Sequence, residues 1–174
     1  MVVDPTFLLE KKDWEKFAEP VKNKPKDYIV TYFLAPKKEY KQKVKEIAKK
    51  YNLEVVNMNK SFDKFYKANP SQFIDLILSA KLVCTNSFHG HAMSIILEKP
   101  FVSFLSFKST KSRIKTLLKM TDLEDRNWEK LQEKDYFALD YSEVREKIKQ
   151  EREKSLSFLK NALNSIETRG GGHK

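Results

Sequence analysis

The sequence predicts an α/β fold in which a Rossmann-like parallel sheet is flanked by helices. Short runs of Val, Ile, Leu and Phe recur with little polar alternation, which is typical of strands that are buried on both faces. Segments with helical spacing of apolar residues separate these runs, and a strand reaches a parallel neighbour only through a crossover of this kind. With 174 residues, the chain has room for one domain with a hydrophobic core.

The first half of the chain contains one complete βαβ unit. Residues 28–34 are predicted as a central strand and residues 53–58 as a second strand. Between them, residues 37–51 have apolar side chains at helical spacing and a stripe of lysines on the opposite side. Before this unit, residues 11–19 are predicted as a short helix that is ended by Pro20.

The second half continues the alternation of helices and strands. We expect a helix opened by Pro70, a strand over residues 80–85, a helix over residues 88–97, a strand over residues 101–105 and a helix over residues 110–120. Together with the first unit, this order favours a doubly wound sheet.

A long helix is predicted over residues 141–166, and we expect it to pack across the sheet. The side chains expected to face inward are Val144, Ile148, Leu156, Leu159, Leu163 and Ile166. Residues 169–174 are expected to form a flexible tail or a cloning remnant. The single domain is therefore assigned to residues 1–168, with residues 1–20 as an interdomain segment and short helix.

Composition and charge limit the classes of function. The single cysteine, Cys84, excludes an internal disulfide and a cysteine-based zinc site, and it suits a reducing, cytoplasmic compartment. The sequence shows no secretion signal and no run of apolar residues that would span a membrane. The formal net charge is +10, but most lysines fall on solvated helix faces, so we expect no specific nucleic-acid partner. A phosphate-sized anion site is compatible with this charge.

The segment Thr85–His91, between a predicted strand and a predicted helix, is the candidate ligand site. In a parallel sheet, the loops that follow the strands share one edge, where ligands bind. Apart from the tail, the two histidines and one glycine of the chain all fall here, as His89, Gly90 and His91. Glycine in a helical turn costs about 1 kcal/mol relative to alanine, so close approach of a ligand or of neighbouring backbone should require Gly90.

Ser87 and His89 have the side chains that an anion site at a helix N-terminus needs. Ser87 is a natural N-cap, which leaves free N–H groups and the positive helix end facing the sheet edge. Histidine changes its charge near neutral pH, so His89 can donate to an anion or act as a general acid. His91 should lie on another side of the helix and have a structural or supporting role. A Ser–His nucleophile pair is disfavoured because Ser87 lacks a glycine-flanked elbow and no acidic orienter is evident.

The loop after the fourth predicted strand brings cations to the same edge. Arg113 could bind a carboxylate through two hydrogen bonds, and Lys108 or Lys111 could neutralise a phosphate. The alternative for the two lysines is a solvated loop.

The run Thr85–Ile96, closed by Lys99-Pro100-Phe101, resembles the signature of polysaccharide pyruvyl transferases. Weaker matches support the resemblance: Val3–Leu9 before Trp14, the strand over residues 28–34, Ser112-Arg113 before Leu117-Leu118, and Leu123–Arg126. Together they cover most of residues 3–126. The central motif is fairly specific, whereas the others alone would be weak.

The resemblance implies a fold and a reaction. Family members are similar to two-domain GT-B glycosyltransferases, and these segments correspond to the C-terminal domain, so an N-terminal domain is expected to be missing. The implied reaction moves a pyruvyl group from phosphoenolpyruvate to two hydroxyls of a sugar, forming a ketal on a surface or exported glycan. No metal or other cofactor is implied. The acceptor would be a saccharide or a lipid-linked saccharide, which places the reaction in the cytoplasm, with peripheral association at the inner face of the membrane through the acceptor.

The resemblance also assigns residues. The histidine that contacts the donor falls on His89. The donor-binding lysine of some members falls near Ser109, so Lys108 or Lys111 would replace it. Some members carry arginine at the position of Ser87, and many carry a small residue at the position of His91.

Two further functions stay open from the sequence. One is a glycosyltransferase half-domain that binds a nucleotide sugar, although no carboxylate after a strand is placed to hold a ribose. The other is a non-catalytic basic module that binds polyanions.

Overall fold

A four-stranded, all-parallel sheet forms the centre of the molecule, as predicted. The computed structural model describes residues 2–58, 65, 67–105, 112–132 and 135–170, with side chains described up to residue 165. The strands are β1 (Tyr28–Tyr32), β2 (Glu54–Asn57), β3 (Leu82–Thr85) and β4 (Phe101–Ser103). Their order in the sheet is β2-β1-β3-β4. Each predicted strand exists, and the observed strands are shorter by one or two residues at their ends.

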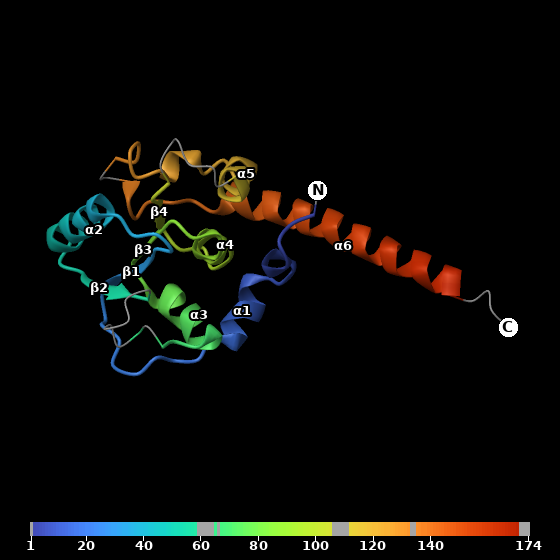
Figure 1. Cartoon of the computed structure of the whole chain (residues 1–174), viewed down its shortest axis with the longest axis horizontal. Helices are drawn as coiled ribbons and strands as arrows, with labels where there is room; N and C mark the ends of the chain where they lie inside the picture. Colours follow the sequence, from blue (N-terminus) through green and yellow to red (C-terminus); the bar gives the residue numbers. More distant parts are fainter. Residues whose placement is uncertain (1, 59–64, 66, 106–111, 133–134, 171–174) are drawn as a thin grey trace.

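Helices cover both faces of the sheet (Figure 1). On one face, α2 (Lys38–Lys50) buries its apolar side against alternate strand residues such as Ile29 and Leu82. On the other face, α3 (Pro70–Ser79), α4 (Phe88–Ile96) and α5 (Ser112–Met120) pack over Val30, Val83 and Phe101. The chain is therefore a three-layer α/β structure whose core lies on both sides of the sheet.

The direction of winding reverses between β1 and β3. The connection from β1 runs through α2 to β2 on one side, and the connection from β3 runs through α4 to β4 on the other. Asn86 joins the two strand ends: its Oδ1 accepts from the N–H of Leu34 at 2.9 Å, and its Nδ2 donates to the carbonyl of Ala35 at 3.1 Å. The edge of the sheet at which α4 begins is thus the topological switch point, and ligands of open α/β sheets bind at such points.

The segment after α5 is buried more deeply than its polar sequence suggests. Arg126, at the end of the short helix η2 (Glu124–Arg126), is 1% exposed. Its guanidinium donates to the carbonyl oxygens of Phe101, Asp135 and Tyr136 at 2.8–3.0 Å. The Arg126 side chain therefore connects the segment after α5 to the start of β4 through hydrogen bonds to backbone carbonyl oxygens.

The long C-terminal helix α6 (Ser142–Gly170) corrects the sequence prediction. Val144 and Ile148 are buried, as expected. The prediction that Leu156, Leu159 and Leu163 face inward is wrong: these side chains are 46%, 40% and 62% exposed.

α6 does not pack across the sheet. It runs beside η1 (Pro5–Leu8), and its C-terminal half projects from the body (Figure 1). The helix extends to Gly170, the rest of the predicted tail lies outside the described residues, and so does the side chain of Ile166. The predicted short helix is confirmed as α1 (Lys11–Phe17). None of the helices in the described part of the chain combines the length and the apolar composition that crossing a bilayer requires.

Candidate functional site

The first turn of α4 begins directly after β3. Ser87 occupies the N-cap position, as predicted, with φ −93° and ψ 140°, but its hydroxyl makes no capping hydrogen bond. The connection is held instead by Thr85, whose Oγ1 donates to the carbonyl of Tyr32 at 2.7 Å and accepts from the N–H of Ser87 at 3.0 Å. The first N–H groups of a helix have no partner within it, so this end of α4 offers donors to an anion.

Gly90 is required by the packing of α4 against β3. A Cβ at this position would lie 2.2 Å from Thr85 Oγ1 and 2.9 Å from Thr85 Cβ. The sequence predicted that a ligand or neighbouring backbone excludes a side chain here, whereas the atoms found closest to this Cβ position belong to the Thr85 side chain. A contact between the Gly90 backbone and a ligand stays a prediction.

His91 is buried between α4 and β4. Its Nδ1 lies 2.7 Å from the carbonyl oxygen of Ser87, and its Nε2 lies 2.8 Å from Ser103 Oγ. A carbonyl oxygen can only accept, so Nδ1 carries the proton, and Nε2 then accepts from the Ser103 hydroxyl. This geometry agrees with the structural role expected for His91.

His89 points to the opposite side of the helix and is exposed to solvent. Its ring meets the ring of Phe88 in an edge arrangement, with 5.5 Å between ring centroids. The imidazole therefore stands at the carboxyl edge of the sheet, beside the N-terminus of α4, where a small anionic ligand can reach it.

Arg113, in the first turn of α5, lies on the same aromatic ring. Its guanidinium carbon is 4.1 Å from the centroid of Phe88, a cation–π stack. Its Nη2 donates to Asp4 Oδ2 at 2.7 Å, while the side chain as a whole is 66% exposed. The structure thus brings His89 and Arg113 together around Phe88, and it leaves most of the Arg113 side chain exposed.

Asp4 is a member of this cluster that the sequence analysis did not select as a site residue. Its Oδ1 accepts from the N–H and the hydroxyl of Thr6 at 3.1 and 2.8 Å. Burial raises the pKa of Asp4, but the hydrogen bonds from Thr6 and the positive charges of His89 and Arg113 outweigh burial and hold this pKa below its usual value. The carboxylate is therefore ionised near neutral pH.

From the sequence, Asp4 could have been found only through the weak matches around residues 3–9, and Phe88 only through the motif itself.

A hollow of about 390 Å³ opens beside this cluster, between the N-terminal segment and α5. Its lining combines the polar groups of Asp4 and Arg113 with the apolar side chains of Phe7, Phe88, Leu117 and Met120. Lys108 and Lys111, which were predicted to bind a phosphate, lie outside the described residues.

Other chemistries find less support at this site. Cys84 is fully buried in β3, and burial raises the pKa of its thiol, so it is not poised as a nucleophile. Among the residues that the structure describes, no three His, Cys, Asp or Glu side chains gather as ligands for a metal ion. The groups that do converge are an imidazole, a guanidinium and a helix N-terminus, which together can bind an anion and transfer a proton.

Comparison with known proteins identifies one family. The family model for polysaccharide pyruvyl transferase matches residues 1–106, which is more than half of the chain. The matched range contains Asp4, Phe88, His89 and Gly90, and Arg113 lies beyond it. No curated protein and no solved structure matches the chain.

Proposed function

The chain belongs to the polysaccharide pyruvyl transferase family, and on that premise we propose that it binds phosphoenolpyruvate at the N-terminus of α4 and transfers the pyruvyl group to a saccharide. Membership of the family points to a transferase and implies a saccharide acceptor. The observation that supports the donor is the convergence of exposed His89 and Arg113 on one aromatic ring, Phe88: His89 meets the ring in an edge arrangement and Arg113 stacks over its face.

The proposed donor has two anionic groups that fit the charges of this edge. The guanidinium of Arg113 uses one Nη2 donor on Asp4 and has further donors for a carboxylate. The N–H groups after Ser87, up to Gly90, would receive the phosphate together with the positive end of the α4 dipole. Lys108 and Lys111 are the proposed additional cations for that phosphate.

His89 is the proposed general acid. Protonation of the enol methylene carbon converts it to a methyl group and leaves the adjacent carbon electrophilic. A sugar hydroxyl oxygen then bonds to this carbon and loses its proton. The carbon–oxygen bond to phosphate breaks, and a second hydroxyl oxygen adds with loss of its proton, which closes the ketal. A proton donor and nearby cations are the groups that this sequence of steps requires.

The acceptor would approach the same edge from solvent. His89 is exposed, so this surface alone does not enclose a substrate. We propose that the opposing wall belongs to a second, GT-B-like N-terminal domain, and that the 174-residue chain alone has little or no transferase activity. The acceptor would be a saccharide or lipid-linked saccharide at the cytoplasmic side of the membrane.

Titration with phosphoenolpyruvate tests donor binding directly. We expect millimolar donor to shift the NMR signals of the His89 ring and the Arg113 side chain. Arg113→Ala should weaken binding at least tenfold, about 1.4 kcal/mol, because a charge-assisted contact is lost. Lys119→Ala, at the other end of α5, serves as the matched control. Absence of any response at millimolar donor, or equal affinity of the Arg113→Ala and Lys119→Ala variants, would contradict the proposal.

A comparison of ligands and the variant His89→Ala test the two alternative functions. A nucleotide-sugar site predicts a larger thermal shift with nucleotide sugars than with phosphoenolpyruvate. A polyanion-binding module predicts affinity that falls steeply with salt and survives His89→Ala. Loss of binding in His89→Ala would exclude the polyanion module.

A further inference from the structure

The helix α2 carries a row of exposed lysines on one flank. Lys38, Lys41, Lys45 and Lys49 follow one another at intervals of three or four residues, which places them on one side of the helix, and we call them the basic stripe. Like charges at these intervals repel one another. Lys38 also lies in the first turn, at the positive end of the helix dipole, where a cation is unfavourable. The folding of α2 by itself therefore does not explain the basic stripe.

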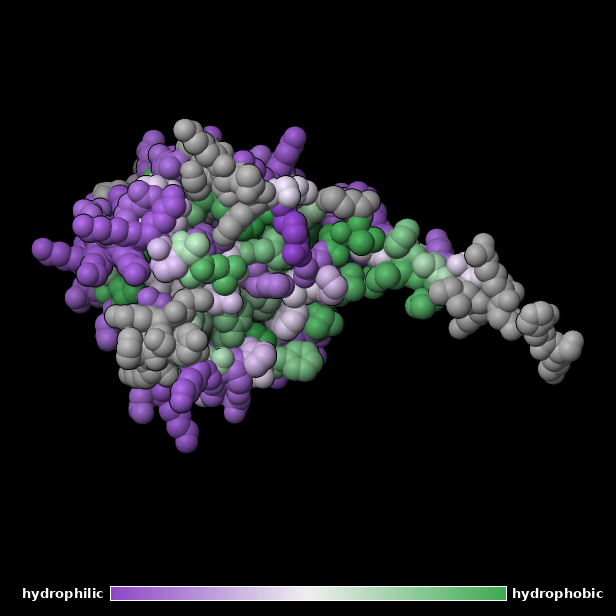
Figure 2. Space-filling view, in the orientation of Figure 1, coloured by the Kyte–Doolittle hydropathy of each residue, from purple (hydrophilic) through white to green (hydrophobic). Residues whose placement is uncertain are grey.

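None of the residues that the structure describes forms an ion pair with the basic stripe. The two glutamates of α2, Glu39 and Glu46, lie within ion-pair distance of other lysines, Lys37 and Lys43. The helix has six lysines and only these two acidic residues in its 13 positions. Figure 2 shows hydrophilic residues gathered over the end of the molecule where α2 lies, away from the projecting half of α6. This flank thus presents unneutralised positive charge to an external partner.

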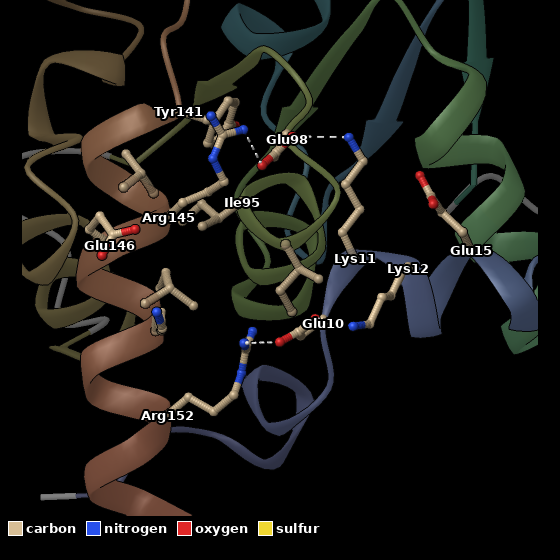
Figure 3. Close-up of a pocket in the computed structure, with 14 residues that line it drawn as sticks. Glu10, Lys11, Lys12, Glu15, Ile95, Glu98, Tyr141, Arg145, Glu146 and Arg152 are labelled. Carbon is tan, nitrogen blue, oxygen red and sulfur yellow. Dashed lines mark hydrogen bonds and ion pairs between the residues drawn. The ribbon is translucent and has the colours of Figure 1, made fainter.

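The cations between α1 and α6, by contrast, are neutralised within the chain. Glu98 accepts from Lys11 Nζ at 3.0 Å and from Arg145 Nη1 at 2.8 Å. Glu10 lies 3.4 Å from Arg152 Nη1, and Figure 3 shows the three basic side chains directed toward these two carboxylates. The basic stripe therefore differs from this region because its charges have no such partners.

An exposed apolar side chain precedes the basic stripe. Leu34 is 60% exposed, and it lies in the connection from β1 to α2, four residues before Lys38. Asn86 holds this connection through the Leu34 N–H at 2.9 Å and the Ala35 carbonyl at 3.1 Å. Because Asn86 directly precedes Ser87, the N-cap of α4, the connection and the candidate site are neighbours at the carboxyl edge of the sheet. Apolar side chains beside lysines are the combination with which proteins bind the membrane interface.

We propose that the basic stripe and Leu34 bind an anionic membrane surface. The stripe extends about 16 Å along α2, so several lysines can contact a flat layer of headgroups at the same time. Leu34 enters the boundary between headgroups and acyl chains, and the carboxyl edge of the sheet is held beside the bilayer. A lipid-linked acceptor would then reach His89 from the same surface. This last step rests on the proposed function, whereas membrane binding does not.

The composition of α2 favours lipid headgroups over nucleic acid. The helix contains no arginine, and its aromatic residue, Tyr40, is 3% exposed. Proteins that bind single-stranded nucleic acid stack bases on exposed aromatic side chains, and arginine makes the paired hydrogen bonds that read guanine. A headgroup layer requires only a high density of positive charge, which lysine supplies. We therefore assign the surface to an anionic bilayer.

Co-flotation with vesicles tests the membrane surface. We expect the chain to bind vesicles of equal parts phosphatidylglycerol and phosphatidylcholine, with affinity that falls as salt rises, and not to bind pure phosphatidylcholine. Each lysine near an anionic surface strengthens binding about fivefold, so the double variant Lys41→Gln, Lys45→Gln should weaken binding at least tenfold. The control Lys119→Gln, Lys160→Gln removes the same charge from exposed positions of α5 and α6 and should weaken binding less than about threefold. No binding to the anionic vesicles, or equal losses in the two double variants, would overturn the proposal.

Two further measurements keep the membrane surface distinct from the donor site and from a nucleic-acid surface. The double variant Lys41→Gln, Lys45→Gln should retain the affinity of the unmodified chain for phosphoenolpyruvate. A chain that binds the vesicles but not phosphoenolpyruvate would contradict the proposed function and support the membrane surface. Binding to duplex DNA more tightly than to the vesicles, with the same loss in this double variant, would show a nucleic-acid surface and overturn the proposal.

A fluorescent label tests the orientation on the membrane. The native cysteine, Cys84, is buried, so an introduced cysteine is labelled alone. An environment-sensitive label on Leu34→Cys should shift its emission to shorter wavelength when the anionic vesicles are added. The same label on Lys119→Cys, at the other end of α5 from the candidate site, should not shift. A shift at Lys119→Cys, or none at Leu34→Cys, would overturn the proposed docking surface.

Discussion

The two sides of the first turn of α4 differ sharply although they are built from consecutive residues. On the inner side, Gly90 packs against Thr85, and His91 donates to the Ser87 carbonyl and accepts from Ser103. On the outer side, partly buried Phe88 and exposed His89 lie beside Arg113. Within this short motif, Gly90 and His91 pack α4 against the sheet, and Phe88 and His89 contribute to the candidate site. Substitutions on the inner side should change folding, and those on the outer side should change donor binding.

The largest effect on stability is expected from His91→Ala. It removes a buried ring and leaves the Ser87 carbonyl and the Ser103 hydroxyl without these partners, which should lower the free energy of unfolding by about 3–4 kcal/mol. Urea unfolding measures the loss. The matched variant His89→Ala should change this free energy by less than about 0.5 kcal/mol. Equal losses of unfolding free energy in the two variants would contradict the distinction between a structural inner side and an exposed outer side of this turn.

Gly90→Ala should lower the free energy of unfolding by about 2–3 kcal/mol, because the added Cβ overlaps the Thr85 side chain. The cause can be isolated with a double-mutant cycle. In a Thr85→Ala background, the same Gly90→Ala change should cost much less, since Oγ1 is gone. An equal cost in both backgrounds would show that the clash with Thr85 is not the reason for glycine.

Phe88→Leu should have a smaller effect on stability, below about 1 kcal/mol, because it removes the stack under Arg113 and leaves the Asp4 ion pair in place. Its effect on donor binding should be larger than its effect on folding. We expect affinity for phosphoenolpyruvate to fall about twofold to fivefold, as about 0.5–1 kcal/mol of cation–π attraction is lost. Calorimetric titration measures this, and an unchanged affinity would show that the ring does not position Arg113.

The smallest effect concerns pH. The pKa of Asp4 is held below its ordinary value in the folded chain, so the stability that Asp4 contributes is present at neutral pH and is lost as the pH falls through the lowered pKa. Asp4→Asn should therefore remove part of the acid dependence below about pH 4 while changing stability at pH 7 by less than about 1 kcal/mol. Thermal unfolding at several pH values measures the difference. An unaltered pH profile would contradict the role of Asp4 as an ionised partner of Arg113.

The two halves of α6 show where sequence reasoning stops. Helical periodicity located the helix and the buried residues Val144 and Ile148, but it also assigned Leu156, Leu159 and Leu163 to the core, and that assignment was wrong. Periodicity reports that a helix has an apolar face. It contains no information on what lies opposite that face, since this depends on where the body of the domain ends.

Long-range contacts explain the other residues that the sequence analysis did not find. Asp4 joins the site through a bond to Arg113 across 109 positions of the chain. In the sequence, Arg126 looks like an ordinary surface charge in a polar segment. In the structure, its guanidinium donates to the carbonyl oxygen of Phe101, the first residue of β4, and to that of Tyr136, which follows Arg126 in the chain. Neither the spacing of residues nor the local composition of the sequence indicates these partners of Asp4 and Arg126.

The sequence by itself determined the alternation of strands and helices, the parallel sheet, the family and the position of the motif at the sheet edge. The family follows from the resemblance of the Thr85–Ile96 motif, and the other features follow from local periodicity and from the obligatory crossover between parallel strands. Only the tertiary structure decided that Arg113 stacks on Phe88 and bonds to Asp4, and that Leu156, Leu159 and Leu163 of α6 are exposed. Those outcomes depend on which surfaces meet in space, and burial is a property of the assembled fold, not of any segment alone.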